Sequence, residues 1–339
     1  MEYREFTRNI TSGQRFKYGA FQLSDRLFGR KTLFSDRAKF YADLAENMKK
    51  NGEGKILPIE RRKDLSIEEF KNHYVKKGIP VVMEGVASEW DCVKKWNLDY
   101  FKNLHGKDEI QLMEADVTKG HETITLADVI DNIRAGGKKY FRFYPLLVRH
   151  PEHLNDFDYN WFKERKTKSM FKDAFQVFIG GQDTCSDLHN ANLPNLFVQV
   201  YGEKKWILYS HYYTPVIDPI PPPSIYRSAP IKKQEAFNPF EPDYTGTYEL
   251  YKYIDGYSVH LKPGDVFWNP PFYWHAVKNV TDSIGVGYRW FNPGYSFTIS
   301  PLYMFLDCLC RNPPIWEAYK YMVKDGNELF LKQARKLKK

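Results

Sequence analysis

The stretch NLFVQVYGEKKWILYS, residues 195–210, contains the clearest pair of neighbouring strands in this sequence. Most residues on either side of Gly202 and Glu203 are β-branched, aromatic or otherwise apolar, as in strands that lie in a protein interior. Only a short glycine-containing turn separates the two runs. The stretch therefore predicts an antiparallel hairpin within a larger buried sheet.

Further strand-like segments follow the same design from about residue 174 onward. They are short, rich in β-branched and aromatic residues, and bounded by Gly, Pro or Asp turns: AFQVFIGG, GYSVHLKPGDVFWNP, YWHAVKNV and SIGVGYRWF. With 24 Phe, 24 Tyr and 8 Trp among 339 residues, the chain can fill a large sheet-rich interior. We expect a mainly β protein with helical additions, in which a closed antiparallel barrel or a two-sheet roll forms one principal core.

Helices and short strands alternate in the first half of the chain. Ser66, Asn97 and Thr125 each precede an apolar-periodic segment and are predicted helix N-caps. The segments between them, PVVMEGV, EIQLMEA and KKYFRFYPLL, are predicted strands. We therefore expect α/β elements before the barrel.

The two ends of the chain are predicted to be helical. Residues 1–54 form an N-terminal extension, 55–297 the main domain with its barrel core at about 174–292, and 298–339 a C-terminal helical region. The amphipathic faces of the last region need a cover, which is either the barrel or a second subunit in a homodimer. Residues 210–256, with PPP at 221–223 and many tyrosines, are long for a connection and indicate either a functional lid or a decorated surface.

Charge and cysteine usage limit the class of partner. Lys plus Arg exceed Asp plus Glu by 8, but no nucleic-acid-binding motif accompanies the basic runs, so we expect solvated helix faces and no nucleic-acid partner. The four cysteines have no metal or disulfide spacing, which favours a reduced, cytoplasmic setting. No apolar run has the length of a signal peptide or a membrane span, so no membrane association is expected.

Two of the nine histidines have the context of metal ligands. His189 precedes one barrel strand and His275 follows the tight NPPFYW corner, so their side chains are expected to converge at a barrel mouth. Two imidazoles and one carboxylate form the facial triad of non-haem Fe(II) oxygenases, and H-x-D is its natural form on a strand. Here the third position is Ala191. The other histidines lack supporting neighbours and are expected to be ordinary core or surface residues: His73, His105, His121, His150, His153, His211 and His260.

Several motifs occur in an order that is typical of one enzyme family. They are PVVMEGV with the following Trp96 segment, the block from His189 to Leu208, the PGD turn at 263–265, and NPPFYWH ending at His275. With these motifs the stretch from about 56 to 292 resembles the jumonji-C branch of the cupin-fold Fe(II)/2-oxoglutarate oxygenases, in particular the asparaginyl-hydroxylase-like group. The resemblance implies a double-stranded β-helix, or jelly-roll, as the core of the 55–297 domain.

The resemblance also implies roles for individual residues. His189 and His275 match the Fe(II) ligands, and Lys204 matches the lysine that pairs with the distal carboxylate of 2-oxoglutarate. Asn195 and Ser186 match polar contacts to that co-substrate, and Tyr140 is expected to add a hydroxyl. Arg289 is a rival to Lys204, because related branches use an arginine there.

Ala191 departs from the family pattern, because a methyl group cannot bind a metal. We favour a halogenase, in which chloride takes the place of the carboxylate and the product carries a new C–Cl bond. One alternative is hydroxylation with Asp187 or water as the substitute ligand, and another is a cupin-fold protein without catalysis. The expected substrate is a small molecule, an amino acid or a peptide.

Overall fold

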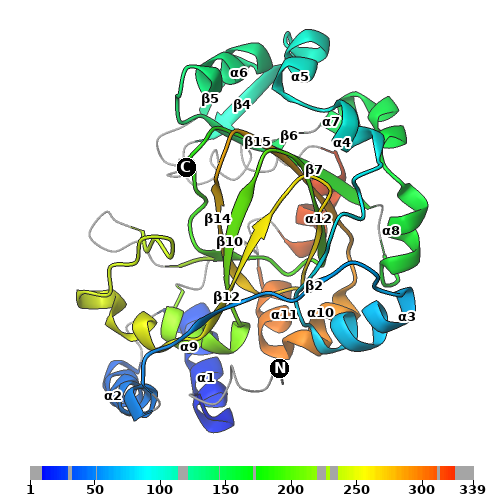
Figure 1. Ribbon diagram of the computed structural model, residues 1–339. Coiled ribbons are helices and arrows are strands. Elements are labelled where there is room, and N and C mark those ends of the chain that lie inside the picture. The colour runs from blue at the N-terminus through cyan, green and yellow to red at the C-terminus, as the bar shows by residue number, and fades with distance from the viewer. Residues whose placement is uncertain are drawn as a thin grey trace.

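Two facing β-sheets form the centre of the molecule, as Figure 1 shows. The computed structural model describes residues 10–29, 33–50, 52–113, 121–144, 146–170, 173–219, 227–229, 236–310 and 314–324. In strand order, one sheet is β1-β12-β10-β14-β8-β11 and the other is β2-β3-β13-β9-β15-β7-β6. All neighbours pair antiparallel except β1 with β12 and β2 with β3, which are parallel. The predicted jelly-roll core is confirmed.

The strands coincide closely with the predicted segments. The hairpin at 195–210 is β9 and β10, and the short strands β1, β2, β5, β8 and β11 are additions that the sequence did not predict. The bounds are β1 Ile56–Pro58, β2 Arg61–Arg62, β3 Val81–Met83, β4 Glu109–Met113, β5 His121–Thr125, β6 Tyr140–Tyr144, β7 Ala174–Gly180, β8 His189–Asn190, β9 Asn195–Tyr201, β10 Lys204–Tyr209, β11 Arg227–Ser228, β12 Gly256–Leu261, β13 Val266–Asn269, β14 Trp274–Asn279 and β15 Ser283–Arg289.

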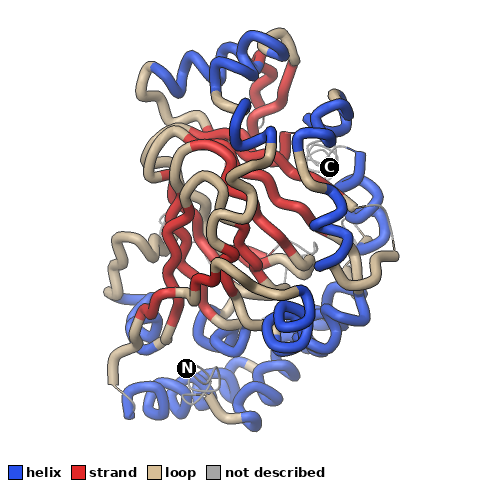
Figure 2. Tube along the Cα trace, turned by 45° about the vertical axis from the view of Figure 1, so that its right-hand side comes forward, coloured by secondary structure: helices blue, strands red, loops and turns tan. Residues whose placement is uncertain are grey.

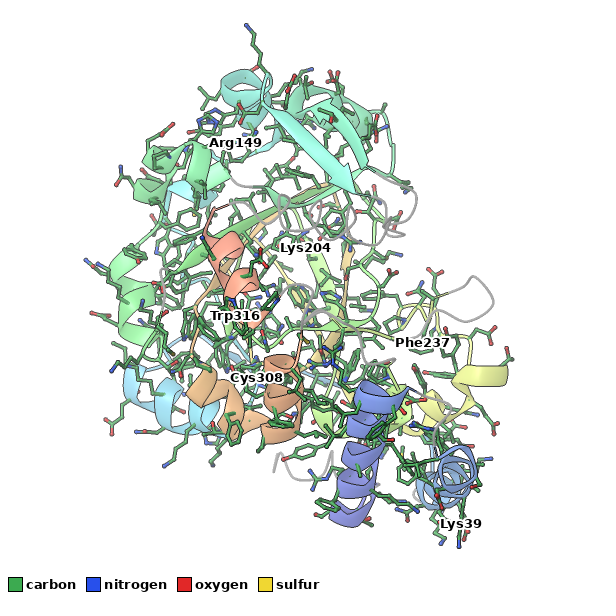
Figure 3. All side chains as sticks on the ribbon, turned by 180° about the vertical axis from the view of Figure 1, so that it is seen from behind. Lys39, Arg149, Lys204, Phe237, Cys308 and Trp316 are labelled. Atoms are coloured by element: carbon green, nitrogen blue, oxygen red, sulfur yellow. The ribbon has the colours of Figure 1, made fainter. Side chains whose placement is uncertain are left out.

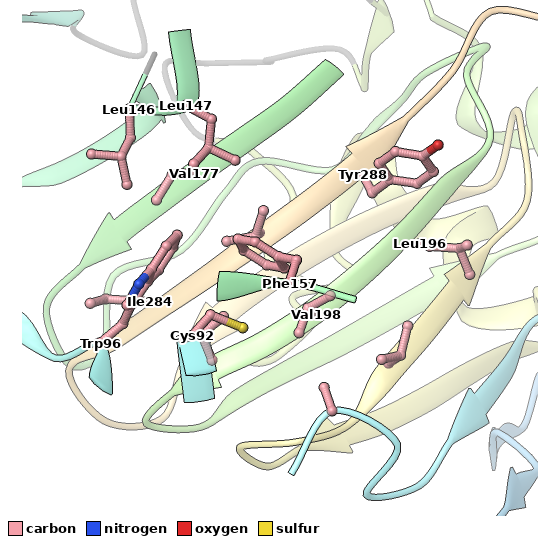
Figure 4. Packing of buried hydrophobic residues seen from close by; sticks show 14 of the residues in the cluster. Cys92, Trp96, Leu146, Leu147, Phe157, Val177, Leu196, Val198, Ile284 and Tyr288 are labelled. Carbon is pink, nitrogen blue, oxygen red and sulfur yellow. The ribbon is translucent and has the colours of Figure 1, made fainter. Parts of the chain in front are cut away.

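The two faces of the seven-stranded sheet carry different apolar clusters, because neighbouring residues of a strand point to opposite faces. On the inner face, Phe178, Phe197 and Phe267 pack with Trp206 of the other sheet. The outer face presents a larger set, part of which is drawn in Figure 4: Val177, Ile179, Leu196, Val198, Val266, Trp268, Ile284, Val286 and Tyr288. The sheet is therefore buried on both sides.

Helices of the first half cover this outer face, where Trp96 and Phe157 pack on the strands (Figure 4). Ser66, Asn97 and Thr125 cap their helices through hydrogen bonds to backbone N–H groups, as predicted. The bounds are α3 Ile67–Glu69, η2 Phe70–Val75, α4 Asp91–Lys95, α5 Leu98–His105, α6 Leu126–Arg134, α7 Leu146–Arg149, η4 Pro151–Asp156 and α8 Tyr159–Arg165. The predicted strand KKYFRFYPLL is too long, because helix α7 begins at Leu146, directly after a proline, which has no N–H to extend a strand ladder.

The N-terminal helices pack beneath the six-stranded sheet with part of the 210–256 segment, at the bottom of Figure 2. Tyr213 and Tyr251 of that segment are buried against Tyr18 and Phe40, so this part is core. The proline run at 221–223 lies outside the described residues, and the lid stays a prediction. The bounds are α1 Ser12–Phe28, α2 Phe34–Lys50, η5 His211–Tyr213, α9 Thr214–Ile217 and η6 Gly246–Tyr253.

Among the described residues, three helices follow the barrel: α10 Pro293–Ile299, α11 Pro301–Cys308 and α12 Ile315–Lys324. Their inner faces pack with Ala174, Leu193 and Phe272 of the barrel. Phe297, Phe305 and Trp316 remain exposed, and the expected homodimer stays a prediction. Within the described part of the chain, no helix combines the length and apolar character that crossing a membrane requires.

Candidate metal centre

His189 and His275 lie side by side inside the barrel. His189 is on β8 and His275 is on β14, and the two residues are direct partners in the antiparallel register. Their ring centroids are 4.3 Å apart at an interplanar angle of 53°. The predicted convergence of the two imidazoles is therefore present in the structure.

Backbone hydrogen bonds set the orientation of both rings. Nδ1 of His189 is 2.7 Å from the carbonyl oxygen of Asp187, and Nδ1 of His275 is 2.8 Å from that of Tyr273. A carbonyl only accepts, so each Nδ1 donates its hydrogen and each Nε2 keeps its lone pair, the form in which imidazole binds a metal. Burial lowers the pKa of His189 to about 4 and that of His275 well below its ordinary value. Both imidazoles are therefore neutral at pH 7 and ready to act as ligands.

The position next to this pair carries no protein carboxylate. The carbonyl oxygen of Ala191 accepts a hydrogen bond of 2.7 Å from the backbone N–H of Phe272, and its side chain is a methyl group. Among the described residues, no Asp or Glu joins His189 and His275 in a group of three ligand atoms that all lie within 4.8 Å of one another, and this includes Asp187. In this structure Asp187 contributes only its backbone to the pair.

The loop after His189 is anchored on helix α11. Nδ2 of Asn192 donates to Oδ2 of Asp307 at 2.7 Å, and the hydroxyl of Ser296 donates to the carbonyl of Asn192 at 2.7 Å. Asp307 is itself paired with the buried Arg227 of β11. These contacts fix the backbone that carries position 191.

Lys204 is a fully buried cation in the barrel interior, near the middle of Figure 3. Its Nζ donates to Oδ1 of Asn279 and, at 2.8 Å, to the hydroxyl of Ser283, both neutral groups. None of the described carboxylates forms an ion pair with it. Burial alone lowers the pKa of Lys204 to about 7. A buried ammonium without a counter-ion is unfavourable, so this position suits an incoming carboxylate.

Asn195 adds a second unsatisfied group to the same interior. Its side chain is buried, and neither its Nδ2 nor its Oδ1 has a hydrogen-bond partner. Arg289 faces it across the β9–β15 register. A Cβ at Gly287 would lie 3.0 Å from Oδ1 of Asn195, and a Cβ at Gly285 would lie 3.1 Å from Cε of Lys204. On its inward face, β15 therefore has glycines, and no side chains, beside Lys204 and Asn195.

Tyr140 and Ser186 differ in how they relate to the site. The ring of Tyr140 lies under the ammonium of Lys204, with Nζ 5.6 Å from its centroid. The hydroxyl of Ser186 accepts the backbone N–H of Val277 at 3.0 Å, while the Ser186 N–H donates to the Val277 carbonyl at 2.8 Å. Tyr140 belongs to the lysine environment, whereas Ser186 ties its own segment to β14.

The field around the imidazoles is positive. Arg142 and Arg289 both help to lower the pKa of His189, and Arg289 also lowers that of His275, in each case behind burial as the larger cause. Arg142 and Arg289 therefore favour an anion beside the two histidines, and the buried Lys204 favours a second one in the barrel interior.

A second group of histidines was missed at the level of sequence. His105, His150 and His153 lie together outside the barrel, although each was assigned to ordinary surroundings. They come from α5, from the loop after α7 and from η4, so no strand context marks them. The close spacing of His150 and His153 was the one signal available.

Comparison with known proteins shows which family and which proteins this chain is similar to. Residues 67–297 match the model of a family described as a cupin-like domain. Lysine-specific demethylase 8 of Xenopus tropicalis is 24% identical over 66% of this chain and 51% of its own length. Lysine-specific demethylase JMJ30 of Arabidopsis thaliana is 25% identical, over 71% and 58%. Human tRNA wybutosine-synthesizing protein 5 is 24% identical, over 70% and 79%. The chain thus spans little more than half of either demethylase.

Proposed function

Because this chain belongs to the family of cupin-like domains, we propose that it is an oxygenase that uses Fe(II) and 2-oxoglutarate to oxidise an unactivated C–H bond. The proposal depends on one observation. His189 and His275 are direct partners on neighbouring strands, and because each Nδ1 donates to a carbonyl, each Nε2 lone pair can bind a metal. Two imidazoles suit Fe(II). Bound iron with 2-oxoglutarate and oxygen supplies the oxidant, and 2-oxoglutarate leaves as succinate and carbon dioxide.

The co-substrate is proposed to extend from the iron position toward Lys204. In that pose the ammonium of Lys204 holds the distal carboxylate, which supplies the missing counter-ion. The unsatisfied amide of Asn195 donates to a co-substrate oxygen on the way. Arg289, which acts on both histidines, is assigned to the end near the metal and not to the distal carboxylate.

For the third ligand position we propose an anion from solution, with chloride as the candidate. The methyl of Ala191 leaves room for it, no described carboxylate competes, and Arg142 and Arg289 favour negative charge there. A chloride ligand would lead to a chlorinated product. Water in the same place would lead to hydroxylation, the outcome that agrees better with relatives whose names refer to demethylation and to tRNA wybutosine synthesis.

An amino-acid or peptide side chain is the proposed substrate, in line with the relatives named for lysine. The relative named for tRNA makes a tRNA nucleoside the competing substrate class. A panel of peptides, amino acids and tRNA, incubated aerobically with iron, 2-oxoglutarate and chloride and analysed by mass spectrometry, distinguishes these classes. The chlorine isotope pattern distinguishes chlorination from a gain of one oxygen.

The test of the centre itself does not need the substrate. Anaerobic Fe(II) and 2-oxoglutarate are expected to give a visible charge-transfer band, and both His189→Ala and His275→Ala are expected to abolish it. No band in the parent protein would support the non-catalytic alternative and overturn the proposal.

Ala191→Asp tests the third position. If chloride binds there, the new carboxylate displaces it, and the tightening of the complex by chloride is lost. Ala38→Asp, at an exposed position of α2, is the matched control and is expected to keep the chloride response. A parent complex that is indifferent to chloride would instead identify water as the third ligand.

A further inference from the structure

A second candidate metal site lies outside the barrel, where three ligand-type side chains converge. His105 ends α5, while Glu152 and His153 are on η4. One ligand atom from each lies within 4.8 Å of the other two. Nε2 of His105 and Nε2 of His153 are 2.8 Å apart and face each other. Two imidazoles and a carboxylate are a ligand set for a divalent ion of the zinc class.

A supporting shell fixes the inner histidine in the form that binds metals. Nδ1 of His153 is 3.0 Å from Oδ2 of Asp156, so it donates there and Nε2 is the nitrogen that faces the ligand position. The same carboxylate oxygen accepts the indole N–H of Trp96 at 2.8 Å. A carboxylate behind a histidine ligand is the usual way in which proteins orient metal-binding imidazoles. His153, Asp156 and Trp96 are all buried, so this arrangement is rigid.

The outer ligands have the freedom to adjust to an ion. On one tetrahedral zinc, two nitrogens at about 2.0–2.1 Å from the metal lie about 3.3 Å apart, so the rings must separate by about half an ångström. His105 is the last residue of its helix and is partly exposed. Glu152 is exposed and points from a surface turn. Both residues are therefore in contact with solvent.

Three carboxylates lie near the pair, and two of them also face basic side chains: Asp156 is 3.7 Å from Nζ of Lys95, and Asp108 is 3.9 Å from a guanidinium nitrogen of Arg149. Nε2 of His150, whose ring stacks on that of His105 at 3.6 Å, is 2.8 Å from Oδ2 of Asp108. Asp156 and Glu152 add two more carboxylates. An ion with two positive charges would therefore enter a region that already carries acidic groups.

We infer that His105, His153 and Glu152 form a structural site for a divalent transition metal such as Zn²⁺. Trp96 belongs to the cluster on the outer face of the seven-stranded sheet, so this site lies on the opposite side of that sheet from His189 and His275. Arg149, next to His150 in sequence, is well separated from Lys204 in Figure 3. The ion would fasten the end of α5 to η4 and so hold the helical layer on the barrel.

The test removes the barrel histidines so that only the outer site can respond. In the His189→Ala/His275→Ala double variant, Zn²⁺ alone is expected to bind at about one ion per chain after desalting and to raise Tm. Adding His105→Ala is expected to remove both effects, and adding Asp156→Asn to weaken zinc binding by about 10–100-fold. Adding His73→Ala, at an exposed histidine outside the cluster, is the matched control and is expected to change neither.

Two results would overturn the inference. The first is a double variant that is folded by circular dichroism and binds no zinc, which would leave the histidine pair as a hydrogen bond only. The second is a His105→Ala variant that binds as much zinc as its parent. If the double variant does not fold, the unmutated chain replaces it, and His105→Ala is then expected to lower bound zinc by one equivalent.

Discussion

Two buried cations in this molecule have opposite surroundings. Arg227 of β11 is paired with the carboxylate of Asp307, and both side chains are almost completely buried. Lys204 of β10 is equally buried, but among the described residues its ammonium donates hydrogen bonds only to the neutral groups of Asn279 and Ser283. The first pair is complete within the protein and holds the end of the barrel on α11. The second is a buried amine with no ion-pair partner among the described residues, which is why we propose it as the position that holds the distal carboxylate of 2-oxoglutarate.

The largest expected effect is a loss of stability when the ion pair between Arg227 and Asp307 is broken. Asp307→Ala leaves Arg227 buried without a carboxylate and removes the acceptor of Asn192, so the free energy of unfolding is expected to fall by about 3–5 kcal/mol. Denaturant titration measures it. Asp64→Ala, at an exposed position, is the control and should stay within about 0.5 kcal/mol of the parent. If Asp307→Ala and Asp64→Ala changed the free energy of unfolding equally, the Arg227–Asp307 pair would not have the structural role described here.

Lys204→Met is expected to act on binding and not on stability. Loss of the ammonium should weaken 2-oxoglutarate binding by about 100-fold, because a charged hydrogen bond is lost. The unfolding free energy should stay the same or rise, since an unpaired buried charge is removed. Calorimetry and denaturant titration measure the two quantities. Lys205→Met, the exposed neighbour, should leave both unchanged; a destabilised Lys204→Met protein would contradict the proposed role.

A pH dependence of binding should follow from the same residue. The folded pKa of Lys204, about 7, is below its value in the unfolded chain. The free protein therefore gains stability as pH rises from about 7 toward 10.5, where only the unfolded chain keeps the proton. Binding of 2-oxoglutarate needs the charged lysine, so affinity should fall by up to about tenfold per pH unit above 7. Calorimetry between pH 6.5 and 9 tests this, and Lys204→Met should flatten the profile.

The smallest expected effect concerns the hydroxyl of Ser186, which we expect to contribute to stability and not to the binding of 2-oxoglutarate. Ser186→Ala removes the acceptor of the Val277 N–H and should lower the unfolding free energy by about 1 kcal/mol. Binding of 2-oxoglutarate should be unchanged, whereas Asn195→Ala should weaken it. If Ser186→Ala bound 2-oxoglutarate more weakly, that result would support the contact between Ser186 and the co-substrate that the sequence predicted.

The barrel and its two central histidines were predictable because their signals are local. Strands of five or more residues such as β7, β9 and β15 carry their own composition, and His189 and His275 adjoin such strands. The strands β8 and β11 have two residues each, which is too short to show the alternation of polar and apolar residues that marks a strand in a sequence. They exist because His189 pairs with His275 and Ser228 with His189. Such pairing depends on tertiary contacts.

The outer histidines were not predictable for a related reason. His105 and His153 are 48 residues apart and come from a helix end and a 3-10 turn. Neither position has a sequence period that shows which way its side chain points. The hydrogen bond from the Val277 N–H to Ser186 was not predictable either, because a serine next to a strand can contact a ligand or a backbone, and this contact depends on the pairing of its segment with β14.

The anchoring of the loop by Asp307 bears on where this chain can be shortened. The family match ends at residue 297, which suggests a shorter fragment for expression. Such a fragment would lack α11 and would leave Arg227 and Asn192 without the carboxylate that both contact. Any minimal fragment intended for activity assays should therefore retain the chain through at least residue 310.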